Sequence, residues 1–200
     1  MAKNWVRDRK RDYYYRKAKK ENYRSRAAYK LIQLNERFRL FKTGDNVIDL
    51  GASPGGWTQV AAECVGAEGS VLAVDMKSVE HVDGAVMVRG DARSQITISK
   101  VRELLPGGLA DVVISDMAPN ISGNYSLDHA RSMELAAMAV QYSDIFLKPG
   151  GNMVVKVFDG DMALDLFRTI QNRFRLAKRH SPKASRKSSS EIYMVGKGKK

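Results

Sequence analysis

Residues 46–57 read NVIDLGASPGGW, a short apolar run that passes into a glycine-rich turn and then into a tryptophan. The apolar run predicts a buried strand at 46–50, and the pattern that starts at Trp57 predicts a helix that extends to Val65. Glycines at such a turn let the backbone approach a ligand closely. The stretch therefore predicts one strand–turn–helix unit of an α/β fold, with a ligand at its turn.

The same alternation continues on both sides of this unit. An apolar stripe of Ala27, Leu31, Leu34 and Phe38 predicts a preceding helix from Ser25. Further strands are predicted at 71–74, 86–88, 112–115 and 153–158, and further helices at 94–105, 126–147 and 161–170. The helix at 126–147 is expected to end at a turn formed by Pro149, Gly150 and Gly151.

Two further strands are predicted at 174–178 and 191–195, with no helix between them. We expect them to form an antiparallel pair at the end of a mostly parallel sheet. The whole chain of 200 residues is therefore predicted to be a single α/β domain, 1–200.

Charge is distributed unevenly along the chain, whose net charge is +12. Residues 1–42 hold 15 Lys and Arg against 4 Asp and Glu, and residues 173–200 hold 10 against 1, whereas residues 43–172 hold 9 against 17. An acidic middle between a basic N-terminal arm and a basic C-terminal segment indicates a polyanionic partner. The alternative is a pair of solvated or disordered tails.

Several protein classes are disfavoured. The single cysteine, Cys64, excludes an internal disulfide and suits a reducing cytoplasm. The first residues lack the apolar segment of a secretory signal, and no run of about 18 apolar residues predicts a membrane span. The three histidines are scattered, so no metal site is predicted.

Acidic residues stand at the ends of successive predicted strands: Asp49, Asp75, Asp91 and Asp116. A single acid of this kind is often only a turn former or a helix cap. In an open α/β sheet, however, ligands bind beyond the carboxyl ends of the strands. Four acids in succession at one rim therefore predict a ligand site.

The glycine-rich turn narrows the class of ligand. Ser53 replaces the second glycine of the dinucleotide fingerprint, the glycine that contacts a pyrophosphate, which disfavours a nicotinamide oxidoreductase. No Gly-Lys-Ser/Thr sequence follows, so a P-loop is absent. A ligand with a ribose but no phosphate fits better, because Asp75 can accept hydrogen bonds from a ribose diol and Asp91 can accept from an adenine amino group.

DLGASPGGW at 49–57, VD at 74–75, GDA at 90–92 and SDMAPN at 115–120 together resemble the RrmJ/FtsJ-type family of RNA 2′-O-methyltransferases, from about Arg24 to Val195. The resemblance implies a Rossmann-like, seven-stranded sheet with an antiparallel last strand and helices on both faces. It also implies S-adenosylmethionine as methyl donor. The expected cofactor-binding residues are those that the resemblance implies together with their neighbours in the same turns. They are Gly51, Ser53, Pro54, Gly55, Gly56, Trp57, Asp75, Met76, Asp91, Ala92 and Asp116. Ser53 is a mild departure, where the family often has alanine.

A candidate base interrupts the apolar strand VVKVF at 154–158. A ribose hydroxyl is a poor nucleophile, and a lysine can accept its proton only if the lysine pKa, ordinarily about 10.4, is lowered by burial or by neighbouring cations. From the pattern alone, Lys156 is as well explained as an outward-facing residue of a half-exposed strand.

The resemblance implies a catalytic tetrad of Lys30, Asp116, Lys156 and Glu191. By this hypothesis Lys156 deprotonates or activates the 2′-hydroxyl and Asp116 holds that lysine beside the methyl donor. Lys30 positions the ribose or stabilises developing charge, and Glu191 orients one of the lysines.

A uridine ribose of large-subunit ribosomal RNA is the expected target, free or in the ribosomal subunit. The alternatives are a tRNA ribose 2′-O-methyltransferase and a non-catalytic RNA-binding protein on the same fold. The basic segments, 7–20, 24–26 and 178–187, are expected to contact RNA, with the tyrosines at 13–15 suited to stacking on bases. We expect a monomer with no obligate protein partner and no membrane association.

Overall fold

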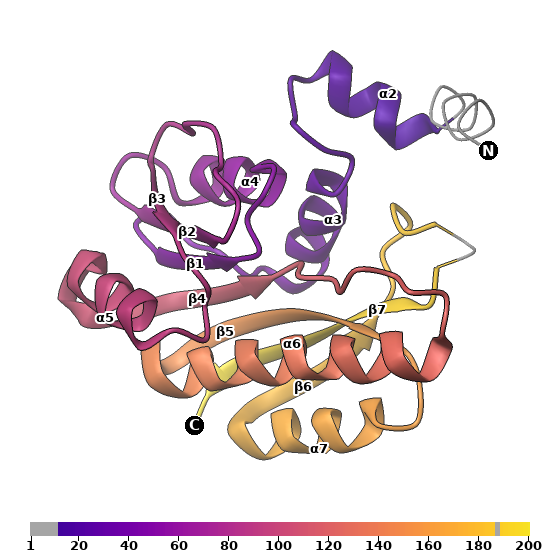
Figure 1. Cartoon of the computed structure of the whole chain (residues 1–200). Coiled ribbons are helices and arrows are strands. Elements are labelled where there is room, and N and C mark those ends of the chain that lie inside the picture. Colours follow the sequence, from indigo (N-terminus) through magenta and orange to yellow (C-terminus); the bar gives the residue numbers. More distant parts are fainter. Residues whose placement is uncertain (1–11, 187–188) are drawn as a thin grey trace.

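The computed structural model describes residues 12–186 and 189–200 (Figure 1). The helices are α2 (Tyr13–Lys20), α3 (Ala28–Phe38), α4 (Gly56–Val65), α5 (Gln95–Leu104), the 3-10 turn η1 (Pro106–Gly108), α6 (Tyr125–Phe146) and α7 (Ala163–Arg173). The strands are β1 (Asn46–Leu50), β2 (Ser70–Asp75), β3 (Ala85–Arg89), β4 (Ala110–Ser115), β5 (Leu147–Phe158), β6 (Phe174–His180) and β7 (Glu191–Lys199).

The strands form one seven-stranded sheet in the order β3-β2-β1-β4-β5-β7-β6. Strands β1 to β5 are parallel to one another, and β7 runs antiparallel to both β5 and β6. This confirms the predicted Rossmann-like fold with an antiparallel last strand. Strand β7 lies between β5 and β6, and its register sets Tyr193 opposite Lys156 and Glu191 opposite Phe158.

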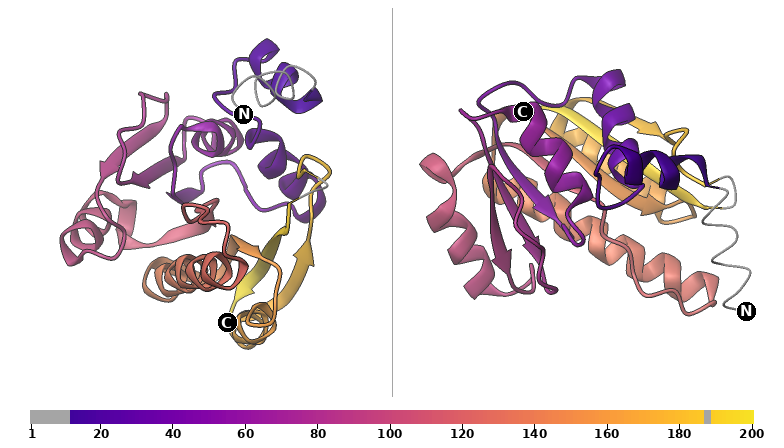
Figure 2. Two further views of the ribbon diagram at one scale, coloured as in Figure 1. Left: turned by 45° about the vertical axis from the view of Figure 1, so that its right-hand side comes forward. Right: turned by 90° about the horizontal axis from the view of Figure 1, so that it is seen from above.

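Helices cover both faces of the sheet, as predicted (Figures 1 and 2). Successive strand residues point to opposite faces, so Ile48 and Leu50 pack in a core with α5, α6 and α7, whereas Val47 packs in a second core with α3 and α4. Both cores consist of buried apolar side chains, most of them fully excluded from solvent. Within the described residues, no helix has the length and apolarity needed to cross a bilayer.

The prediction that Pro149–Gly151 form a turn between the helix and the next strand is wrong, because these residues lie inside β5. The partner of Ala110 is Leu147, but the partner of Val112 is already Asn152, so β5 bulges here. Gly150 has φ +83°, and a Cβ at Gly151 would lie 2.8 Å from the Asp111 carbonyl oxygen. The glycines therefore permit a bulge in the strand that carries Lys156.

Helix α2 was not predicted, because its highly charged sequence YYYRKAKK has only a narrow apolar face, Tyr14 and Ala18. Asp12 caps it by accepting a hydrogen bond from the Tyr15 amide, and Ala18 packs with Tyr29 of α3. The basic arm is thus a docked helix from Tyr13 onward. The RNA contacts predicted for residues 7–11 lie outside the described residues.

Two lysines of the basic C-terminal segment serve the fold. The Lys197 ammonium donates to the carbonyls of Phe38 and Arg39 at the end of α3, at 2.6 and 2.7 Å. The Lys199 ammonium donates to three carbonyls at the end of α6 at 2.6 to 3.0 Å. Cations at helix C-termini satisfy carbonyls that lack helical partners. Burial lowers the pKa of both lysines, and neither is free to meet a phosphate.

Candidate active site

A cavity of about 480 Å³ opens beyond the carboxyl ends of the parallel strands β1 to β4. Its volume lies within the range of small-molecule sites, and it occupies the rim where ligands bind in open α/β sheets. Seven of the residues predicted for the cofactor line it: Gly51, Ser53, Asp75, Met76, Asp91, Ala92 and Asp116.

Asp75 ends β2 with its carboxylate already oriented by the backbone. Its two oxygens accept hydrogen bonds from the amides of Ser53 and Lys77, at 2.9 and 2.8 Å. A carboxylate has about four acceptor positions, so two remain for ligand hydroxyls.

Asp91 follows β3 and is paired with Arg93, whose guanidinium lies 2.7 Å from the carboxylate. The side chain and amide of Arg93 lower the pKa of Asp91. A ligand amino group at Asp91 would therefore share the carboxylate with this arginine.

The glycine-rich turn is shaped by close contacts. Gly51 has φ +74°, and a Cβ there would lie 2.4 Å from Met117 Cγ, so the turn packs directly on the loop after β4. Gly55 and Gly56 instead face the N-terminal segment, where added Cβ atoms would meet Arg24 and Ser25.

The indole of Trp57 is buried between α3 and Tyr193, and its Nε1 donates to the Ala27 carbonyl at 2.9 Å. The four predicted cofactor residues that do not line the cavity are Pro54, Gly55, Gly56 and Trp57. They form the body of the turn instead.

Asp49 lies fully buried below the turn. Its Oδ2 accepts from the Thr58 hydroxyl at 2.7 Å, and its Oδ1 has no hydrogen-bond partner. Burial raises the pKa of Asp49 to about 7, and the charges of Asp116 and Asp75 act in the same direction. A carboxyl group with one unpaired oxygen and no cation beside it favours the protonated form.

Lys156 points toward the α3 side of the sheet and is 7% exposed, so the outward-facing alternative is wrong. Its ammonium lies 2.9 Å from Asp116 Oδ1 and 2.5 Å from the Asp116 carbonyl oxygen. Asp116 also lines the cavity. The candidate base is therefore fixed at the edge of the candidate cofactor site.

Lys30 and Glu191 form a second pair, with 2.5 Å between Nζ and Oε1. Both side chains are 11% exposed. Lys30 comes from α3, where it is buried rather than at the side of the apolar stripe, and Glu191 begins β7. The four residues of the predicted tetrad are thus joined as two pairs on the same side of the sheet.

Tyr193 connects the two pairs, and the sequence analysis missed it. Its hydroxyl donates to Asp116 Oδ1 at 2.7 Å, and its ring centroid is 5.9 Å from the Lys30 ammonium. Burial and the nearby carboxylates raise the pKa of Tyr193 well above its ordinary value, so it remains a neutral donor. The available signal was its spacing, because a residue two positions after Glu191 in a strand shares its face.

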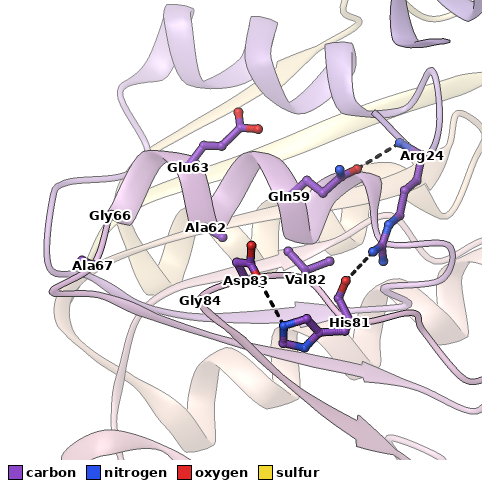
Figure 3. A pocket seen from close by; sticks show the side chains of 10 residues that line it. All are labelled: Arg24, Gln59, Ala62, Glu63, Gly66, Ala67, His81, Val82, Asp83 and Gly84. Carbon is purple, nitrogen blue, oxygen red and sulfur yellow. Dashed lines mark hydrogen bonds and ion pairs between the residues drawn. The ribbon is translucent and has the colours of Figure 1, made fainter. Parts of the chain in front are cut away.

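A larger hollow of about 650 Å³ lies between α4 and the β2–β3 connection (Figure 3). The Arg24 guanidinium crosses it to the carbonyls of Glu80 and His81. Gln59 bonds the main chain of Arg24 on the other side, at 2.9 Å. Arg24, predicted to contact RNA, is thus engaged in tying the N-terminal segment to this connection. Among the described residues, no three His, Cys, Asp or Glu side chains are grouped to hold a metal ion.

Comparison with known proteins places this geometry in a family. The family model described as FtsJ-like methyltransferase matches residues 23–199. Relatives named ribosomal RNA large subunit methyltransferase E include that of Methanosarcina mazei, 50% identical over 96% of this chain and 70% of its own. That of Archaeoglobus fulgidus is 50% identical over 94% of this chain and 96% of its own.

Among solved structures, a protein from Plasmodium falciparum described as a ribosomal RNA methyltransferase superposes with a TM-score of 0.80. It is 28% identical in sequence, and the match covers 88% of this chain and 98% of that one. The chain therefore belongs to the FtsJ-like methyltransferase family.

Proposed function

We propose that this protein transfers a methyl group from S-adenosylmethionine to a ribose 2′-hydroxyl of large-subunit ribosomal RNA, at a uridine. The observation that carries the proposal is a buried Lys156, held by Asp116 at the edge of the strand-end cavity. The ribosomal substrate is supported by the names of the relatives, which are about 50% identical over nearly the whole chain. Such a substrate implies a cytoplasmic enzyme, and we propose that it acts as a monomer.

The cavity suits S-adenosylmethionine by its chemistry. Asp75 offers two free acceptor positions for a ribose diol, and Gly51 leaves room for close approach of the backbone. When bound, the cofactor supplies an electrophilic methyl group on a sulfonium centre. Asp116 lines the cavity and contacts Lys156, so the donor site and the candidate base adjoin.

The contacts of Lys156 would orient its amine for the role of base. A neutral amine has two N–H donors and one lone pair, and Asp116 presents two acceptors to this nitrogen, a carboxylate oxygen and a carbonyl oxygen. With both hydrogens engaged, the lone pair is left for the proton of the 2′-hydroxyl. The resulting ammonium is stabilised by the Asp116 carboxylate.

Lys30 supplies positive charge on the other side of the cluster. Glu191 fixes its ammonium, and the Tyr193 ring lies beside it. There it positions the ribose and stabilises the charge that develops on the attacking oxygen. Tyr193 holds Asp116 in place through its hydroxyl.

The test is methyl transfer from labelled S-adenosylmethionine to purified large ribosomal subunits, naked ribosomal RNA and bulk tRNA, with the modified nucleoside identified. Label in ribosomal substrate as 2′-O-methyluridine, absent with Lys156→Ala, is the expected result. Label in tRNA would instead favour the alternative function, a tRNA ribose 2′-O-methyltransferase. Cofactor binding without label in any substrate would favour a non-catalytic RNA-binding protein.

A further inference from the structure

A third, smaller pocket of about 360 Å³ adjoins the candidate catalytic cluster of Lys30, Asp116, Lys156, Glu191 and Tyr193. Its lining residues are Arg26, Lys30, Arg186, Ser189 and Glu191. Lys30 and Glu191 belong to the tetrad, so this pocket shares a wall with the candidate catalytic site. A group bound here would lie next to Lys30 and Glu191.

The charges of the pocket suit an anion. Three of its five lining side chains are cations, and its one carboxylate, Glu191, is already paired with Lys30. Both guanidiniums lie near the same oxygen, Oδ2 of Asp12, and burial together with the charge of Arg186 lowers the pKa of Arg26. Two planar, weakly hydrated guanidiniums and a hydroxyl are donors that match phosphate oxygens.

In the structure a carboxylate meets both guanidiniums. Oδ2 of Asp12 is ion-paired with Arg26, and it lies 3.9 Å from Arg186 Nε. Asp12 also caps α2, and its side chain is 12% exposed, whereas that of Arg186 is 55% exposed. The arm thus brings its own anion to the pair of arginines beside the pocket.

We propose that Arg26 and Arg186 bind one backbone phosphate of the substrate RNA, the one next to the target ribose, and that Asp12 holds this place in the free protein. The inference rests on the proposed function. In RNA the 2′-hydroxyl and the 3′-phosphate are on neighbouring carbons, so a ribose positioned by Lys30 brings its 3′-phosphate toward the pocket that Lys30 lines. RNA binding then exchanges Asp12 for a phosphate oxygen.

The first test compares Arg186→Gln with Lys183→Gln, which removes the same charge from the same loop but does not line the pocket. The probe is a short fluorescein-labelled oligouridylate, with binding followed by anisotropy from about 50 to about 200 mM salt. We expect Arg186→Gln to weaken binding about tenfold and to reduce the slope of log Kd against log salt by about 0.7. Lys183→Gln should weaken it less than about twofold. Equal effects of the two variants would overturn the subsite.

The second test compares Asp12→Asn with Glu21→Gln. Asparagine keeps the cap of α2 and removes the charge, and Glu21 lies at the other end of the same helix, where glutamine still accepts from Tyr29. We expect Asp12→Asn to tighten RNA binding at least about threefold and Glu21→Gln to leave it nearly unchanged. An equal gain from both would mean a general charge effect and would overturn the role of Asp12.

These readouts separate the two proposals. Binding of the oligouridylate does not need methyl transfer, so wild-type protein that shows the Arg186 effect but methylates no RNA would keep the subsite and overturn the proposed function. Wild-type protein that methylates ribosomal RNA, with no difference between Arg186→Gln and Lys183→Gln, would overturn the subsite alone.

Discussion

The site contains two buried lysine–carboxylate pairs that resemble each other in distance but differ in how they are held. Lys156 comes from a strand in the middle of the sheet, and both of its contacts are to Asp116, which in turn accepts from Tyr193. Lys30 comes from a helix, and one carboxylate oxygen of Glu191 fixes it. The first pair is suited to moving a proton between fixed atoms, whereas the second supplies charge and position.

Replacing each lysine with arginine is the strongest test of this difference, because arginine keeps the charge but cannot lose its proton in a protein. At position 156 we expect kcat to fall about a thousandfold or more in both Lys156→Arg and Lys156→Ala, because the proposed base is lost in each. The cofactor dissociation constant, measured by calorimetry, should stay within about twofold. The control is Lys148→Arg at the exposed start of the same strand, which should be active. If Lys156→Arg were active, Lys156 would supply only a positive charge and would not act as the base.

The same exchange at position 30 should be tolerated. We expect Lys30→Met to lower kcat/KM about 10- to 100-fold, because the charge at the attacking oxygen is lost, and Lys30→Arg to recover most of it. Steady-state kinetics with varied RNA measure both. If arginine proved as harmful as methionine at this position, Lys30 would also be moving a proton.

Tyr193→Phe removes the contact that distinguishes Asp116 from Glu191 while keeping the ring beside Lys30 and Trp57. We expect about a tenfold loss in kcat, because Asp116 is held less firmly beside Lys156, with a smaller rise in the KM for the methyl donor, whose cavity Asp116 also lines. Tyr23→Phe is the matched control, since it removes a hydroxyl that also donates to a carboxylate, that of Glu63. Unchanged kcat in Tyr193→Phe would leave Tyr193 a packing residue.

Asp49 can be compared with the two lysine–carboxylate pairs, because it is a buried carboxyl group whose hydrogen-bond partner is Thr58 and not a lysine. Its pKa of about 7 in the folded protein is above the unfolded value of 3.8. The contribution of Asp49 to the stability of the folded protein is therefore fully present below about pH 4 and is lost as pH rises toward 7. The free energy of unfolding should fall by roughly 1 kcal/mol per pH unit in this window because of Asp49. Between pH 5 and pH 6, the free energy of unfolding measured in urea should fall less in Asp49→Asn than in the wild type. If the two proteins showed the same pH dependence, Asp49 would not have a raised pKa in the folded protein.

Much of the fold was predictable because each strand and helix of the α/β unit carries a local pattern. The strand-end acids Asp75, Asp91 and Asp116 do line a common cavity, since parallel strands bring their carboxyl ends to one rim. The facing of Lys156 was not predictable from alternation, because valines on both sides of it are buried when helices cover both faces of a sheet.

Other features depended on contacts between distant segments. The pairing of Lys30 with Glu191 requires β7 to be inserted beside β5, and no local pattern fixes that position. Helix α2 is held by the cap at Asp12 and by the packing of Tyr14 and Ala18 on α3, a face too narrow to be recognised in so charged a sequence. The basic C-terminal segment was interpreted by charge alone, which cannot tell a lysine that closes a helix end from one that meets RNA.

The place of β7 has a consequence for biosynthesis. Domains emerge from the ribosome from the N-terminal side, and β7 is the last of the seven strands to be synthesised although it lies between β5 and β6. A nascent chain that has emerged only through β6 has every strand that lines the strand-end cavity, but it lacks Glu191, Tyr193 and the lysines that close the ends of α3 and α6. The sheet and the candidate catalytic cluster therefore both need the same last segment of the chain, so that an unfinished chain has no assembled cluster.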